Sequence, residues 1–219
     1  MVLNITNGDY FNRYFLKNYN TEYAGDAIPF REAMIQGDTE KEVLSNAFIS
    51  TRAKVLNVDE KFYKENAKDI LDFCNRHNAY REIRLWFGRD SFCQLNLLTL
   101  LALLEKIHYK GKISLYIIDD ESFDVVEKNI PVTLGVYQDL YTKILIERIP
   151  APTILQFGVI FKRAIELYYD YLSNDGNLAK YILENKEKDE TTLIKELLLQ
   201  TKEYGLSDLN IIELIKRIQ

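Results

Sequence analysis

The sequence has few of the residues that carry covalent or metal chemistry, with two cysteines and two histidines among 219 residues. Cys74 and Cys93 are too few for a disulfide framework, which favours a reducing compartment. His77 and His108 are not spaced with the cysteines as zinc ligands, so we expect no metal. The common nucleotide and hydrolase signatures (G-x-G-x-x-G, the Walker A loop and G-x-S-x-G) do not occur in the sequence.

Long apolar runs and an excess of positive charge are also missing. The most apolar stretch, residues 95–104, is too short to cross a bilayer. No basic region followed by an apolar core begins the chain, so we expect no secretory signal. The 28 Lys and Arg are outnumbered by 33 Asp and Glu, and the net charge of −5 argues against electrostatic binding of nucleic acid or membrane. These features predict a cytoplasmic protein without those partners.

Proline is scarce too, and two of the four prolines stand together in Pro150-Ala151-Pro152. This is the clearest linker signal in the chain. It predicts two domains, residues 1–150 and residues 151–219. A hydrophobic fraction of 47%, with fifteen Tyr and eleven Phe, indicates packed structure throughout.

Strand-like and helix-like stretches alternate in the first domain. The first strand is expected at the apolar run of Val2, Leu3 and Ile5, which Asn7-Gly8 breaks, and further strands at residues 27–30, 83–87 and 113–118. Pro29 places the second strand at an edge of the sheet or marks that strand's very end. Helices are expected from Asp9, from about Asp38 or Thr39, over 59–77, over 92–109 and over 135–148. The fold class is therefore α/β, with a mostly parallel sheet of about four strands flanked by helices. Residues 157–171, 178–185, 191–204 and 207–218 predict an all-helical C-terminal domain.

The first and third strands each end in a turn that contains glycine and opens a helix. Asn7-Gly8 leads to Asp9, expected as a helix cap, and Gly88 leads to Asp90, expected in the same role. Such turns bring free backbone N–H groups and positive helix ends to the carboxyl edge of the sheet, where ligands of open α/β sheets bind.

Polar residues gather at this edge. The candidate ligand-binding residues are Asn7, Gly8, Asp9, Arg31, Glu32, Arg89, Asp90 and Gln94. Arg31 and Arg89 could hold an anionic ligand, with Asp9, Glu32 or Asp90 as a base. The alternative is structural, with Asp9 and Asp90 as helix caps and Arg31 and Glu32 in an ion-pair network.

Two further features have open interpretations. Asp119-Asp120-Glu121, after the fourth strand, could bind a hard cation or form a solvated loop. Cys93, near a helix N-terminus, could be a thiol of lowered pKa or a buried core residue. Trp86 is expected in the core.

Three separated stretches also carry a resemblance to a known family. They are Ile5-Thr6-Asn7-Gly8-Asp9, Ile28-Pro29-Phe30-Arg31-Glu32 followed by Gly37, and Leu85-Trp86-Phe87 through Asp90 to Gln94-Leu95. In order and spacing they resemble a bacterial domain of unknown function, numbered eighteen thirty-five. Tyr204-Gly205-Leu206-Ser207-Asp208 is similar to the end of its helical companion domain. Gly88 and Arg89 stand where that family usually has an acidic residue and a histidine, and the resemblance implies a fold and a site location but no reaction or cofactor.

Two hypotheses of function follow. The first is a pocket at the strand ends for a small anionic or nucleotide-like ligand, with transferase or hydrolase activity. The second is a non-enzymatic regulatory or interaction module whose helical domain binds a partner or a second copy of the chain. Aromatic residues of the last third motivate it: Phe157, Phe161, Tyr168, Tyr169, Tyr171 and Tyr181. Residues 153–219 carry nine Lys and Arg against eleven Asp and Glu, so we expect them not to bind DNA.

Overall fold

The protein is built on one five-stranded sheet. A computed structural model describes residues 1–149 and 159–219 and orders the strands β2-β1-β3-β4-β5. Their bounds are β1 Val2–Asn7, β2 Asp26–Phe30, β3 Glu82–Phe87, β4 Lys112–Ile118 and β5 Val125–Pro131. The first four pair in parallel, which confirms the predicted α/β class, and β2 is an edge strand, as Pro29 predicted. The antiparallel strand β5 was not predicted.

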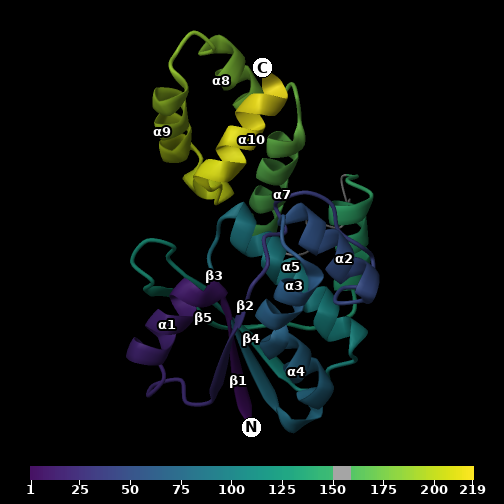
Figure 1. The fold of residues 1–219 in the computed structure, drawn as a ribbon. Coiled ribbons are helices and arrows are strands. Elements are labelled where there is room, and N and C mark those ends of the chain that lie inside the picture. Colours follow the sequence, from purple (N-terminus) through teal and green to yellow (C-terminus); the bar gives the residue numbers. More distant parts are fainter. Residues whose placement is uncertain (150–158) are drawn as a thin grey trace.

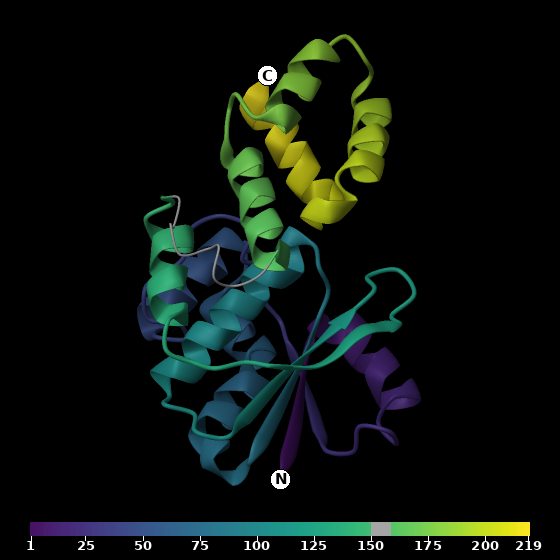
Figure 2. The ribbon, with the colours of Figure 1, turned by 180° about the vertical axis from the view of Figure 1, so that it is seen from behind.

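Helices cover both faces of the sheet (Figures 1 and 2). Helix α1 (Gly8–Asn18) packs on one face, where Phe11 and Phe15 meet Trp86 and Tyr116 in an aromatic cluster. The other face carries α2 (Asn46–Val55), α3 (Glu60–Asn66), α4 (Lys68–Arg76) and α5 (Ser91–Lys106). Trp86 is fully buried, which confirms its predicted core position.

Helix caps decide where several helices begin. Asp90 caps α5 and accepts a hydrogen bond from the Cys93 N–H, as predicted. Asp59 and Ser207 cap α3 and α10 (Asp208–Ile218), also as predicted. The cap predicted at Asp9 is wrong, because α1 begins at Gly8 with no side-chain cap and Asp9 lies inside its first turn.

Two other helix boundaries differ from those predicted. The helix expected from residue 38 or 39 begins only at Asn46, because Ser45 supplies the cap and Leu44 has a φ of 60°, which a helix does not allow. The single helix expected over 59–77 is divided at Ala67 into α3 and α4.

The described residues of the last third of the chain are mostly helical. Helix α6 (Tyr137–Tyr141) and the π-helical turn η2 (Thr142–Ile146) occupy the helix expected over 135–148. Helices α7 (Val159–Leu172), α8 (Asn177–Glu184), α9 (Glu190–Gln200) and α10 follow, with the turn η4 (Lys202–Tyr204) after α9. Helix α7 packs on α5, and the Ser91 hydroxyl donates to the Ala164 carbonyl at 2.7 Å. The predicted linker at 150–152, the boundary at residues 150 and 151, and Phe157 lie outside the described residues.

Among the helices described, none combines the length and the apolar character that a membrane span requires.

Candidate functional site

The carboxyl ends of β1 and β3 lie side by side at a topological switch point. From β1 the chain passes through α1 to β2 on one side, whereas from β3 it passes through α5 to β4 on the other. The two crossover helices cover opposite faces of the sheet, and ligands of open α/β sheets bind near such a point. Asn7, at the end of β1, donates from Nδ2 to Sγ of Cys93, near the start of α5, at 2.9 Å.

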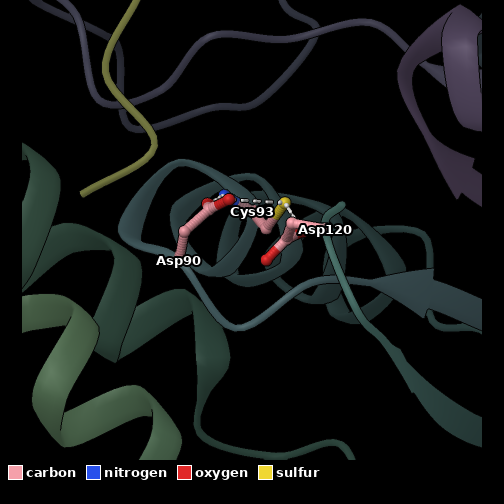
Figure 3. Close-up of side chains that lie close together, drawn as sticks. All are labelled: Asp90, Cys93 and Asp120. Atoms are coloured by element: carbon pink, nitrogen blue, oxygen red, sulfur yellow. Dashed lines mark hydrogen bonds between the residues drawn. The ribbon is translucent and has the colours of Figure 1, made fainter. Parts of the chain in front are cut away.

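Two carboxylates and a thiol meet at the ends of β3 and β4 (Figure 3). The Cys93 Sγ lies 3.5 Å from Oδ2 of Asp90 and 3.5 Å from Oδ1 of Asp120. Asp90 comes from the loop that opens α5, and Asp120 follows β4. One ligand atom from each of the three residues lies within 4.8 Å of the others, and such a set could hold a metal ion. Carboxylates also cluster in this way without an ion.

Two glycines make room for the two carboxylates. The Asp120 carboxylate occupies the space in which a side chain at Gly88 would lie. Gly205, which has a φ of 67°, lies against Asp90, since an added Cβ would stand 2.7 Å from its Oδ1. The loop between η4 and α10 therefore covers Asp90, and it can do so only with glycine at this position.

Burial is the main cause that raises the pKa of both acids. Burial and the nearby charge of Asp120 raise the pKa of Asp90 to about 7, and burial raises that of Asp120. Burial, followed by the two carboxylates, raises the pKa of Cys93 well above its ordinary value. The structure thus favours the buried-residue interpretation of Cys93 over a lowered thiol pKa. Within residues 1–149 and 159–219, no cationic side chain forms an ion pair with Asp90 or Asp120.

A cavity of about 390 Å³ opens on the carboxylate pair. Its acidic wall comes from the loops after β3 and β4. Its cationic side chains are Arg89, Arg163 of α7 and Lys202 of η4. Each has a glutamate partner: Arg89 pairs with Glu127, Arg163 with Glu203 at 2.8 Å, and Lys202 with Glu121. The C-terminal helices therefore complete a cavity that begins at the strand ends.

The predicted site residues divide between this cavity and other places. Arg89 and Asp90 line the cavity, and Asn7 contacts Cys93 behind it. Arg31 instead donates to Asp9 at 2.9 Å and to Asp69 at 2.8 Å, so it links α1 to α4. This is the structural ion-pair alternative, although Arg31 does not pair with Glu32 as expected there.

Glu32 and Gln94 are buried in the protein. Glu32 lies 3.3 Å from the fully buried Arg52 and accepts a hydrogen bond from the Tyr63 hydroxyl. Burial raises the pKa of Glu32 to about 7. Gln94 donates to the Gly88 carbonyl, so it supports the turn before Asp90. Gly8 has a φ of 76° and open space beside it, which leaves the start of α1 accessible.

Sequence reasoning missed Arg163, Lys202 and Glu203. No local pattern could have found them, because the packing of the C-terminal helices alone brings them to the strand ends. Asp120 and Cys93 had a weak signal, since both follow a strand or open a helix at the carboxyl edge of the sheet.

No family model matches the chain, and neither does any curated protein or solved structure. The resemblance to the domain numbered eighteen thirty-five therefore stays a prediction.

Proposed function

We propose that the protein binds a small nucleotide-like ligand, with an anionic group and hydroxyl groups, in the cavity at the ends of β3 and β4. The main support is that three cationic side chains from three separate elements meet the Asp90–Asp120 pair in one cavity. The cations would bind the anionic group, and the carboxylates would accept hydrogen bonds from hydroxyl groups.

The existing ion pairs of Arg89, Arg163 and Lys202 leave these cations available. The side chains of their partners Glu127, Glu203 and Glu121 are 44%, 66% and 75% exposed. Exposed ion pairs contribute only about 0–1 kcal/mol each. A phosphate with several acceptor oxygens can therefore replace a glutamate at small cost.

The position of the cavity in the sheet supports the same proposal. Ligands of open α/β sheets bind at the carboxyl ends of the strands near a topological switch point, and the cavity begins at the end of β3, one of the two strands at that point. Asp90, which caps α5, also brings the positive N-terminal end of that helix to the cavity.

A hydrolase or transferase activity is the chemistry that we propose for this cavity. A carboxyl group with a pKa of about 7, such as that of Asp90, takes up and releases protons near neutral pH. Asp90 would act as the general acid or base on the bound ligand, and the nearby charge of Asp120 helps to keep the pKa of Asp90 raised.

Thermal unfolding in the presence of AMP, ATP, ribose 5-phosphate or inorganic phosphate tests the binding. A ligand that binds the native state raises Tm with its concentration. In Arg163→Ala and Lys202→Ala the same rise in Tm should need about ten to a hundred times more ligand, since each variant lacks a charge-assisted contact of about 1.5–3 kcal/mol.

Lys162→Ala and Lys188→Ala are matched controls, because both lysines are paired on the same helical region but do not line the cavity. No rise in Tm with any of these compounds would refute the proposal, as would equal losses in the cavity variants and the controls.

Part of the observation that motivated the interaction-module hypothesis has a structural explanation. Tyr168 and Tyr171 are 1% and 6% exposed, and the Tyr181 hydroxyl donates to Glu196 within the helical region. These three aromatic residues pack the C-terminal helices together, and the hypothesis itself stays a prediction.

A further inference from the structure

A row of buried polar contacts leads from the loop after β2 to the carboxylate pair. Its first member, Asn96 of α5, is fully buried. The Asn96 Oδ1 accepts from the Met34 backbone N–H at 3.0 Å, and its Nδ2 donates to the Glu32 carbonyl at 2.6 Å. These two backbone groups fix the orientation of the Asn96 amide. If its O and N were exchanged, a donor would face the Met34 N–H and an acceptor would face the Glu32 carbonyl.

The orientation of Asn96 fixes that of Asn7. Its Nδ2 also donates to Oδ1 of Asn7 at 3.0 Å. With its oxygen turned toward Asn96, Asn7 directs its own Nδ2 to Sγ of Cys93 at 2.9 Å. The Cys93 sulfur therefore accepts a hydrogen bond from Asn7, at the end of β1.

A thiol whose sulfur accepts a hydrogen bond on one side can still donate its own S–H proton to a group on the other side. Oδ2 of Asp90 and Oδ1 of Asp120 each lie 3.5 Å from Sγ, within the range of a hydrogen bond from S–H. Cys93 is 6% exposed, so water competes little for this proton.

We infer that Asn7, held by Asn96, is a positioning residue that turns the Cys93 thiol toward Asp90 and Asp120. It thereby sets how readily this pair takes up a proton. The inference rests on the proposed function for its use, because proton exchange by the pair serves a bound ligand. It goes beyond that proposal by assigning a role to a side chain outside the cavity lining.

Other charged groups also face the pair. The loop after β4 carries Asp119 and Glu121, and Arg89 precedes Asp90. Helix α7 supplies Arg163, and η4 supplies Lys202 and Glu203. In the part of the chain that the structure describes, none of these side chains forms a hydrogen bond with the Asn7 side chain, so a substitution at Asn7 leaves their charges in place.

The test is a pH titration of the ligand-free protein, treated with EDTA to remove any bound metal ion and labelled with ¹³C at the aspartate carboxyl carbons. The Asp90 and Asp120 signals are assigned with Asp90→Asn and Asp120→Asn. Asn7→Ala should raise the titration midpoint of the pair by about half a pH unit, because a weak S–H donor to the carboxylates is no longer held in place.

Cys93→Ala should raise the midpoint in the same direction, and Cys93→Ser, which keeps a donor, should restore it toward the original value. Asn7→Ala added to Cys93→Ala should cause no further shift, because Asn7 acts through the thiol. A merely structural effect of Asn7 would persist in that background.

Two results would overturn the inference: an unchanged midpoint in Asn7→Ala, or a shift that persists when Cys93 is absent. If Asn7→Ala does not fold, Asn7→Ser serves instead, since its hydroxyl is too short to reach Sγ. The titration contains no ligand, so its failure is distinct from a failure of the ligands to raise Tm.

Discussion

The carboxylate of Asp120 occupies the space in which a side chain at Gly88 would lie. Gly88→Ala therefore forces Asp120 away from Asp90 and Cys93 or shifts the turn that opens α5. We expect a loss of about 1–3 kcal/mol in the free energy of unfolding, the usual range for an overpacked site, measured by urea denaturation.

A double variant separates this contact from other effects of the added methyl group. In an Asp120→Ala background, Gly88→Ala should lower the free energy of unfolding clearly less, because the carboxylate that the added methyl group meets is absent. An equal cost in both backgrounds would contradict the steric explanation.

Asp90 predicts a particular dependence of stability on pH. Its pKa rises from an ordinary 3.8 to about 7 in the folded protein, mainly through burial and then through Asp120. The contribution of the Asp90 carboxyl group to the free energy of unfolding is therefore greatest below pH 3.8, and it is lost as the pH rises to 7. Asp90→Asn keeps the helix cap and removes the charge. Between pH 4 and 7 the free energy of unfolding of the variant, relative to that of the original protein, should increase by up to about 1.4 kcal/mol per pH unit.

Urea denaturation at intervals from pH 4 to 8 measures this difference. Asp189→Asn is the matched control, since Asp189 also caps a helix but its pKa is lowered by hydrogen bonds from Thr192. The difference in free energy of unfolding between Asp189→Asn and the original protein should stay constant above pH 4. The Asp189 carboxylate loses its stabilising charge only as the pH falls below its ordinary pKa of 3.8. A constant difference for Asp90→Asn as well would show that its carboxyl group does not titrate in this window.

Local patterns predicted the parallel strands and most helix starts because those depend on neighbouring residues. Asp59, Asp90 and Ser207 cap helices through groups only three positions along the chain. Strand β5 escaped detection, since its Glu127-Lys128-Asn129 centre is polar and its pairing with β4 is set by tertiary structure.

The candidate site was harder to predict than the fold. Arg31 looks like an anion-binding residue at a strand end, but its partner Asp69 stands 38 positions away and is found only in three dimensions. Arg163 and Lys202 are far from any strand in the sequence and reach the cavity through the packing of α7 and η4. The position of a residue at a strand end can be inferred from the sequence. The distant residue with which a charged side chain forms an ion pair cannot.

Glu105 anchors the start of α6 with a single carboxylate. Its Oε1 accepts from the backbone N–H groups of residues 135–137, and its Oε2 accepts from that of Gln138 at 2.8 Å. Glu105→Ala leaves these donors without their partner, and we expect a loss of about 2–4 kcal/mol in the free energy of unfolding. Amide hydrogen exchange at 135–138 should accelerate at the same time.

Glu187→Ala is the control, since that glutamate is exposed and makes no hydrogen bond or ion pair in the described part of the chain. A loss for Glu105→Ala no larger than for this control would contradict the anchoring role.

The prediction that the C-terminal region does not bind DNA gains a structural reason. Its cations are interspersed with acids and form no basic face: Arg163 lies beside Glu203, Lys188 beside Glu196 and Lys202 beside Glu121. Arg217 donates to the Tyr171 carbonyl and lies 5.4 Å from the centre of that ring. A single phosphate group can replace one exposed glutamate, but a DNA backbone needs many phosphate contacts along a basic surface, and the net charge over residues 153–219 is −2.

Fluorescence anisotropy with a labelled duplex, using the full chain at low and moderate salt, tests this expectation. We expect no binding at micromolar protein in either buffer. Binding that weakens steeply as salt rises would show that the cations leave their glutamates for phosphate. Arg163→Glu would then identify the surface, because reversing a charge in a true phosphate-binding region lowers both the affinity and its salt dependence.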